Sequence, residues 1–288
     1  MIHLSGKNRA LNEVTVKRVG EKEEDTLIMI HGYGAGLGFF YKNFKPISRI
    51  KGLKLYALDI LGCGNSSQPA FKIHAKKKED QARKLEQFTL LGHSLGGYLA
   101  VSYAIKYPGR LKKLILASPV GIPSDPYAIN ASIPEPNTST IQNEITQDQQ
   151  STTDQNAKSQ ALHDYSFSIF KQKGNSKYTL AYILAPGAYT RRPVIDRIQE
   201  VGHQTITKPD RTTVKETGSL ASEEKLKETR QKVLENATED EKKRENGNAK
   251  VLLVPKAGHH LYLNNPEVFN DMIRKELEDT QKSKQRKQ

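Results

Sequence analysis

Short apolar segments separated by turn-forming residues run through the first 120 residues. The run at 26–30 is continuously apolar, as in a strand covered on both faces. Each segment ends in a Gly, Pro, Asp or Ser cluster, where turns form at low cost. The first segment alternates apolar and polar positions, as an edge strand does. A helical pattern from Leu95 to Ile105 directly follows one of the runs. Strands that alternate with helices predict an α/β protein with a mostly parallel sheet. The segments predicted as strands are 12–17, 26–30, 53–58, 88–91 and 114–117.

The second half of the chain changes character several times. Residues 124–160 are rich in Asn, Gln, Ser, Thr and Pro without periodicity, which predicts a flexible insertion. Residues 161–199 regain enough apolar character for two or three helices. The charged stretch 221–246 carries Glu/Lys pairs four residues apart and predicts a solvated helix. A last strand is predicted at 250–254 with a helix after it, and the basic residues from 281 onward are expected to be disordered.

These patterns predict one α/β core that is interrupted by one insertion. A chain of 288 residues can bury one large core, and a mean hydropathy of −0.66 indicates that parts of it lie outside that core. We expect the core to comprise 1–120 and 200–288. The segment 121–199 is then a cap, and its first part, 121–160, is expected to be largely flexible.

Charge and cysteine content indicate which class of partner and which cellular compartment to expect. The formal net charge of +13 favours an anionic partner, and without a nucleic-acid motif we expect an anionic membrane surface rather than nucleic acid. A basic surface without any partner is an equal alternative. The single cysteine, Cys63, excludes an internal disulfide and fits a reducing compartment. No apolar run approaches the roughly 18 residues of a membrane span, and residues 1–10 resemble neither a signal peptide nor a presequence. We expect an intracellular protein, and its oligomeric state stays open.

The strongest chemical signal is the sequence GHSLGG at 92–97. It fits the pattern G-x-S-x-G directly after a predicted strand and directly before a helical pattern. Glycines permit a sharp turn at places where a Cβ atom would collide with the neighbouring chain. Such a turn lifts the Ser94 hydroxyl clear of the sheet, and the start of the helix offers the backbone N–H of Leu95 to a developing oxyanion. We predict that Ser94 is a nucleophile, and a merely structural turn is the alternative.

An oxyanion requires a second donor. The sequence HGYG at 31–34 directly follows the strand predicted at 26–30, and the backbone N–H of Tyr33 is the candidate. A plain glycine-rich turn is the alternative. A phosphate-binding loop is not expected, because no Lys-Ser or Lys-Thr pair follows the glycines.

A serine hydroxyl needs a base that takes its proton. His259 follows the last predicted strand, in the place expected for that base, and the adjacent His260 is the alternative. We expect His93 to pack within the turn at Ser94. We expect His31 to lie near the loop that carries Tyr33, which we call the oxyanion loop. No His, Cys and Asp cluster has the spacing of metal ligands, so no metal site is predicted.

The acid that would orient the imidazole is not evident from the sequence. No convincing strand lies between the runs at 114–117 and 250–254, and residues 203–214 are the nearest candidate. We therefore expect the sheet to lack one late strand. Asp210, within that segment, and Asp125 are the two candidate acids.

Five segments together resemble one branch of the α/β-hydrolases. The branch contains the fungal cardiolipin deacylases and the animal lipid-droplet lipase co-activator with its relatives. The resemblance runs from about Asn12 to Asn270, with gaps. It implies an α/β-hydrolase fold with a mostly parallel sheet, flanking helices and a helical cap, and an acyl-lipid substrate without a cofactor. It also implies that Ser94 is the nucleophile and His259 the base, and it suggests a mitochondrial or lipid-droplet membrane. The segments are YGAGLGFFYKNF, ALDILGCGNSS, GHSLGGYLA, SPVGIP and AGHHLYLNNPE.

The chain departs from that branch at three places. Relatives carry a Gly-x-x-Asp-Trp-Met-Asp type segment that supplies the triad acid, whereas this chain has no tryptophan at all. The fifth residue after His259 is Asn264, where relatives often have an aspartate linked to acyl transfer, and this weakens an acyltransferase assignment. Cys63 replaces a residue that is usually bulky, and we interpret it as a small packing residue rather than a reactive thiol.

Three hypotheses follow from the sequence. The first is a serine esterase that acts on phospholipid or cardiolipin, with lysophospholipid acyl transfer as a variant. The second is a lipid-binding or lipase-regulating protein with impaired catalysis. The third is a chain that has lost a central strand and folds poorly, because unpaired buried backbone groups cost about 1–3 kcal/mol each.

Overall fold

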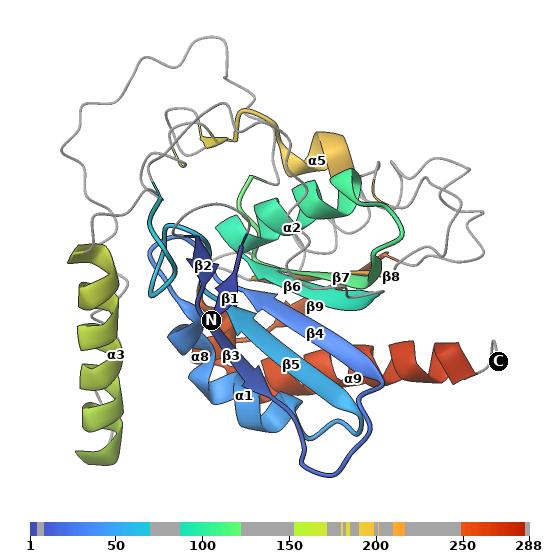
Figure 1. The fold of residues 1–288 in the computed structure, drawn as a ribbon, viewed down its shortest axis with the longest axis horizontal. Coiled ribbons are helices and arrows are strands. Elements are labelled where there is room, and N and C mark those ends of the chain that lie inside the picture. Colours follow the sequence, from blue (N-terminus) through green and yellow to red (C-terminus); the bar gives the residue numbers. More distant parts are fainter. Residues whose placement is uncertain are drawn as a thin grey trace.

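The molecule contains one large sheet, one small sheet and helices on both faces of the large sheet (Figure 1). The computed structural model describes residues 1–4, 9–69, 87–121, 153–171, 180, 183–184, 190–198, 201, 210–216 and 249–285. The strands are β1 (Ile2–His3), β2 (Ala10–Leu11), β3 (Glu13–Val16), β4 (Asp25–Ile30), β5 (Leu53–Leu58), β6 (Phe88–His93), β7 (Leu111–Ala117), β8 (Asp210–Glu216) and β9 (Ala249–Val254). The helices are η1 (Leu37–Phe40), α1 (Tyr41–Ile47), α2 (Leu95–Lys106), α3 (Thr153–Lys171), α5 (Val194–Arg197), α8 (Leu261–Asn264) and α9 (Pro266–Gln285).

The large sheet has seven strands in the order β3-β5-β4-β6-β7-β8-β9. Only the edge strand β3 is antiparallel to its neighbour, and the other five pairs are parallel. The carboxyl ends of parallel strands meet at one edge of a sheet, where ligands bind in open α/β folds. The mostly parallel sheet predicted from the sequence is therefore confirmed, as is the edge strand in the segment 12–17.

Two apolar clusters hold the helices to the sheet. One joins η1, α1, α8 and α9 to one face, and the other joins α2 and α5 to the opposite face (Figure 1). In α9, Phe269, Ile273 and Leu277 recur every four residues and are almost fully buried, as expected for one face of an amphipathic helix. The ammonium of Lys113 in β7 also lies 2.8 Å from the carboxylate of Glu276 in α9, and both side chains are buried.

The expectation that the sheet lacks a late strand is wrong. Strand β8 lies between β7 and β9 and is paired with both in parallel register, from Lys113↔Asp210 to Glu216↔Val254. Its sequence, DRTTVKE, contains one aliphatic residue, so hydrophobic patterning could not reveal it. Backbone hydrogen bonds to two neighbours define the strand instead.

Two expectations about irregular segments also need correction. Helix α3 begins at Thr153, so the end of the segment expected to be flexible is helical, while residues 122–152 lie outside the described part. Helix α9 continues to Gln285, so the basic residues from 281 to 285 are helical rather than disordered. The charged stretch 221–246 lies outside the described residues. In the part of the chain that is described, no helix is both long and apolar enough to cross a membrane.

Candidate active site

The turn predicted at Ser94 is present. Ser94 joins β6 to α2 with φ 50° and ψ −117°, a left-handed backbone that is rare outside glycine. Its N–H donates to the Ala117 carbonyl at 3.1 Å, and its own carbonyl accepts the N–H of Gly97 at 3.0 Å. A Cβ atom on Gly96 would lie 2.5 Å from the carbonyl oxygens of His31 and Ile30. The turn therefore requires glycine at 96, because backbone atoms leave no room for a side chain.

The Ser94 side chain is partly exposed at the carboxyl edge of the sheet. It does not cap α2, and within the described residues no hydrogen bond joins its hydroxyl to His259. Catalytic hydrogen bonds are often long or misaligned in a protein without substrate and tighten when the substrate binds. The structure thus places the hydroxyl at the predicted position without an engaged base.

Both candidate oxyanion donors lie beside this turn. A Cβ atom on Gly32 would lie 2.9 Å from Cβ of Ser94, so the loop that carries Tyr33 packs directly against the serine. Leu95 is the first residue of α2, and the first N–H groups of a helix have no acceptor within it. The two backbone segments that the sequence singled out are therefore adjacent at Ser94.

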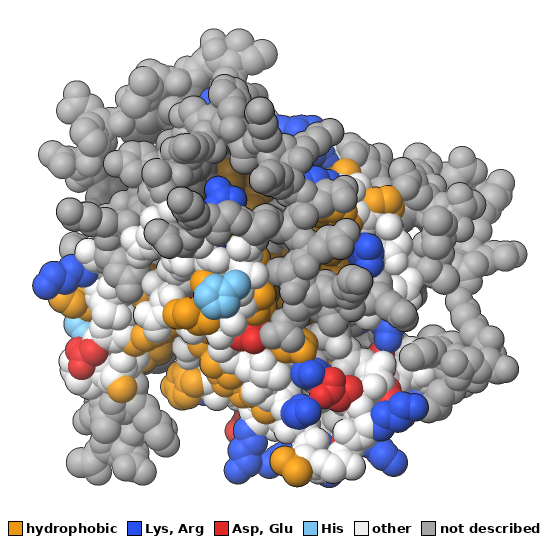
Figure 2. All heavy atoms as spheres, viewed as in Figure 1, with side chains coloured by type: hydrophobic (Ala, Val, Ile, Leu, Met, Phe, Trp, Pro, Cys, Tyr) orange, Lys and Arg blue, Asp and Glu red, His pale blue; other side chains and the backbone are white. Residues whose placement is uncertain are grey.

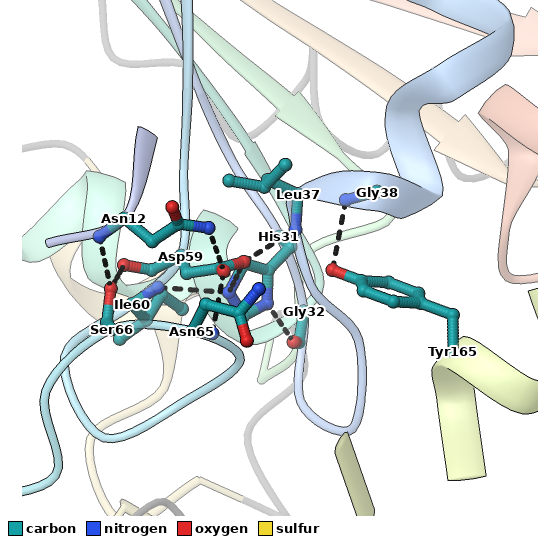
Figure 3. Close-up of polar contacts among 10 residues, drawn as sticks. All are labelled: Asn12, His31, Gly32, Leu37, Gly38, Asp59, Ile60, Asn65, Ser66 and Tyr165. Carbon is teal, nitrogen blue, oxygen red and sulfur yellow. Dashed lines mark hydrogen bonds and ion pairs between the residues drawn. The ribbon is translucent and has the colours of Figure 1, made fainter. Parts of the chain in front are cut away.

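His31 is buried and fixes the base of the oxyanion loop (Figure 3). Its Nδ1 lies 2.7 Å from the Gly32 carbonyl and must donate, whereas its Nε2 accepts the N–H of Ile60 at 3.0 Å. This pair of bonds requires a neutral ring, and burial accordingly lowers the pKa of His31. His31 is thus a structural residue next to the loop, as predicted.

Asp59, which directly follows β5, ties three segments together (Figure 3). Its buried carboxylate accepts the N–H of Leu37 at 2.7 Å, the N–H of Asn65 at 3.0 Å and the side-chain amide of Asn12 at 2.9 Å. These N–H groups provide the hydrogen-bond partners that a buried carboxylate requires. Asp59 therefore anchors the start of η1 to the loop after β5 and to the edge of the sheet.

Helix α3 packs on the glycines that follow the oxyanion loop. A Cβ atom on Gly34 would lie 2.5 Å from the ring of Phe170, and one on Gly38 would lie 2.8 Å from the ring of Tyr165. The Gly38 N–H donates to the Tyr165 hydroxyl at 3.2 Å (Figure 3), and burial raises the pKa of Tyr165 to about 12. The glycines thus admit a helix from the predicted cap close to Tyr33, which explains glycines that the sequence analysis left unassigned.

His259 lies in the loop after β9 and reaches the same edge of the sheet. Nε2 of His93, the residue before Ser94, lies 2.8 Å from the His259 carbonyl and must donate to it. The two imidazole rings are 4.7 Å apart. The Gly258 N–H donates to the side-chain oxygen of Asn264 at 3.1 Å. These bonds hold the His259 loop against the turn at Ser94.

Ser118, which directly follows β7, contacts the His259 ring. Its hydroxyl oxygen lies 3.1 Å from Nδ1 of His259. Ser118 is the first residue of the segment SPVGIP, but the sequence alone indicates no role for its side chain. The contact could be found only from the parallel packing of β6, β7, β8 and β9.

The second predicted packing histidine, His93, is fully enclosed. Burial, followed by the neighbouring His260 and His259, lowers its pKa well below the usual value. Since Nε2 carries the proton donated to His259, Nδ1 is unprotonated, and it is buried without a hydrogen-bond partner. His260, the alternative base, stacks at 5.3 Å on His93 and at 5.5 Å on Phe39.

Comparison with known proteins supports this architecture. Residues 25–162 match the family described as alpha/beta hydrolase fold. The esterase EaEST from Exiguobacterium antarcticum superposes with a TM-score of 0.57 at 17% identity, over 93% of this chain and 95% of that one. The chain has the α/β-hydrolase fold.

The names of two curated relatives of this chain refer to acyl lipids. The chain is 40% identical over 120 residues to rat 1-acylglycerol-3-phosphate O-acyltransferase ABHD5, which covers 38% of this chain and 34% of that protein. It is 40% identical over 124 residues to mouse (lyso)-N-acylphosphatidylethanolamine lipase, over 38% and 36% of the two chains. The matched segment thus spans about a third of each of these relatives.

The register of β8 shows where one of the two candidate acids lies relative to Ser94. Asp210 is the first residue of β8 and pairs with Lys113, whereas Val214 pairs with Ala117, next to Ser94. Four residues of strand place the backbone of Asp210 about 13 Å from that edge, and this register argues against Asp210 as the acid. Asp125 lies outside the described residues. The carboxyl end of β8 is Glu216, opposite Val254.

Cys63 is buried and forms no disulfide, as expected for a packing residue. Among the described residues, no group of three His, Cys, Asp or Glu side chains could hold a metal ion.

Proposed function

We propose that this α/β-hydrolase is a serine-dependent carboxylic-ester hydrolase that acts on acyl lipids. The observation that carries the proposal is the strained turn at Ser94, with φ 50° and ψ −117°, beside the Gly32 loop and the His259 loop. Strained residues persist only where the surrounding structure over-determines them, and they cluster at active sites.

Each group has a defined role in this proposal. Ser94 attacks the acyl carbonyl and gives its proton to His259, which passes that proton to the departing alcohol. The backbone N–H groups of Tyr33 and Leu95 stabilise the oxyanion. A hydrolytic water then repeats the sequence on the acyl-enzyme and releases the fatty acid.

The substrate class is an acyl glycerophospholipid, and cardiolipin is one member of it. The names of the two lipid relatives both refer to an acyl group and a phosphate, and a net charge of +13 favours an anionic lipid surface. On the face drawn in Figure 2, Lys and Arg side chains lie in several separate places, with Asp and Glu side chains beside some of them. We therefore propose that dispersed basic side chains, rather than one basic patch, attract the protein to an anionic lipid surface.

Fatty-acid release from vesicles tests the proposal. Purified protein is incubated with vesicles of cardiolipin and phosphatidylcholine, or of phosphatidylcholine alone, and the released fatty acid is quantified by mass spectrometry. We expect release from the anionic vesicles, a loss of at least about 100-fold in Ser94→Ala, and no change in Ser48→Ala, which removes an exposed hydroxyl. Equal release from wild type and Ser94→Ala would refute the serine mechanism.

Acyl transfer is the second candidate, because the rat relative is named an acyltransferase. Adding a lysophospholipid acceptor to the same assay separates the two reactions. A hydrolase releases free fatty acid at the same rate with or without the acceptor. An acyltransferase forms a diacyl product, and the release of free fatty acid falls. A lipid-binding protein without catalysis would bind the vesicles and yield neither product.

A further inference from the structure

The Ser118 hydroxyl occupies the position at which serine hydrolases usually place a carboxylate. It lies 3.1 Å from Nδ1 of His259, the nitrogen that does not take the proton of the nucleophile. In a catalytic triad the group at Nδ1 holds the imidazole in the tautomer whose Nε2 is free to accept a proton. A hydroxyl oxygen can accept the Nδ1–H in the same way.

The backbone places Ser118 beside the nucleophile through hydrogen bonds on both sides. The Ala117 carbonyl accepts the N–H of Ser94, and the Ser94 carbonyl accepts the N–H of Val120, each at 3.1 Å. Between these two bonds, Ser118 has φ 43°. Pro119 follows it and packs against the start of α2, since a Cβ atom on Gly97 would lie 2.7 Å from its ring. The turn at Ser118 is therefore locked to the turn at Ser94.

We propose that Ser118 is a positioning residue for the general base. The Nδ1–H of His259 donates to the Ser118 hydroxyl oxygen, so Nε2 is unprotonated and faces the site of attack. This inference rests on the proposed function and deepens it, because it names the group that sets the tautomer of the base.

The reaction balances with these residues and water. The Ser94 oxygen bonds to the acyl carbon while its proton moves to Nε2 of His259, and the ester C–O bond breaks as that proton passes to the leaving alcohol. Water then gives a proton to Nε2, its oxygen attacks the acyl-enzyme, and the fatty acid leaves as the proton returns to Ser94. Ser118 keeps the Nδ1–H bond throughout and takes no proton.

A hydroxyl orients the imidazole but carries no charge to stabilise the imidazolium. The titratable rings that face His259 in the described residues are His93, at 4.7 Å, and His260, at 5.5 Å. A carboxylate at position 118 would supply both the bond and the charge, which gives the proposal a gain-of-function test.

Steady-state hydrolysis of p-nitrophenyl octanoate by the full chain measures this role. We expect Ser118→Ala to lower kcat about tenfold or more while KM changes less than about twofold. Ser118→Asp restores kcat to at least the wild-type value and moves the acid limb of the pH–rate profile about one unit higher. Ser168→Ala, which removes an exposed hydroxyl on α3, is the matched control and leaves both constants unchanged. Thermal melts of each variant identify any loss of folding.

Nitrogen-15 NMR of histidine-labelled protein provides a readout that does not depend on turnover. We expect neutral His259 to carry its proton on Nδ1 in wild type and to shift toward the Nε2-protonated form in Ser118→Ala. An Nε2-protonated His259 in wild type would overturn the proposal, as would a Ser118→Ala enzyme that is folded and retains wild-type kcat.

The two proposals fail in distinguishable ways. If wild type has no esterase activity, the proposed function fails, and the NMR tautomer still decides the role of Ser118. If activity is present and Glu216→Gln, rather than Ser118→Ala, lowers kcat and moves the pH profile, the orienting group is the residue at the end of β8 and the Ser118 proposal is wrong.

Discussion

Two serines hold left-handed backbones at the ends of neighbouring parallel strands, and different forces fix them. Ser94 follows β6 with φ 50°, and Ser118 follows β7 with φ 43°. Ser94 is confined by crowding, because the backbone of Ile30 and His31 leaves no space for a side chain at Gly96. Ser118 is confined by the hydrogen bonds on either side of it. A positive φ thus occurs at Ser94 beside a crowded glycine, and at Ser118 between two hydrogen bonds that join its neighbours to Ser94.

The crowded turn is expected to be the less tolerant of the two. Gly96→Ala places a Cβ atom 2.5 Å from two carbonyl oxygens, and we expect the free energy of unfolding to fall by about 3 kcal/mol. Urea denaturation followed by circular dichroism measures this change. Gly20→Ala is the control: Gly20 has φ 81° with no atom near its Cβ position, so only backbone strain of about 1 kcal/mol is expected. Equal losses in the two variants would show that crowding does not determine the turn at Ser94.

Acid should lower the free energy of unfolding through the two buried histidines beside Ser94. Folding lowers the pKa of both His31 and His93 below the usual 6.5, chiefly through burial. Below about pH 6.5 the unfolded chain binds protons that the folded chain does not, so stability is complete above that pH and is lost as the pH falls toward the folded-state pKa values. We expect up to about 1.4 kcal/mol per pH unit for each histidine.

Urea titrations between pH 7 and pH 5 test this expectation in wild type and in His93→Phe. The variant retains a ring but cannot be protonated, so the slope of its unfolding free energy against pH should be the smaller. Identical slopes in the two proteins would contradict the neutral, buried state assigned to His93.

Relief of backbone strain should have the smallest effect and should be the same at both serines. Glycine adopts positive φ without strain, so Ser94→Gly should be more stable than Ser94→Ala by about 1 kcal/mol, and the Ser118 pair should show the same difference. Thermal melts of the four variants provide the comparison. An alanine variant as stable as its glycine counterpart would show that the turn at that position relaxes.

The way in which each turn is held determines whether the sequence could reveal it. Crowding at Ser94 demands glycines, and these remain visible as G-x-S-x-G, so the turn and the neighbouring Gly32 loop could be predicted. Hydrogen bonds at Ser118 use backbone groups that every residue has, so the segment SPVGIP indicates neither that turn nor its contact with His259. Strand β8 overlaps the candidate segment 203–214 but was not predicted as a strand for a related reason, because its pairing with β7 and β9 places few demands on side chains. Asp59 was passed over because its partners lie far along the chain or in the backbone.

The central claim is that Ser94 is a nucleophile activated by His259, and covalent labelling tests it most directly. Wild type and His259→Gln are treated with a long-chain fluorophosphonate, and the modified residue is identified by peptide mass spectrometry. We predict an adduct on Ser94 that forms at least about 100-fold more slowly in His259→Gln. An adduct elsewhere, or an equal rate of labelling without the imidazole, would contradict the account.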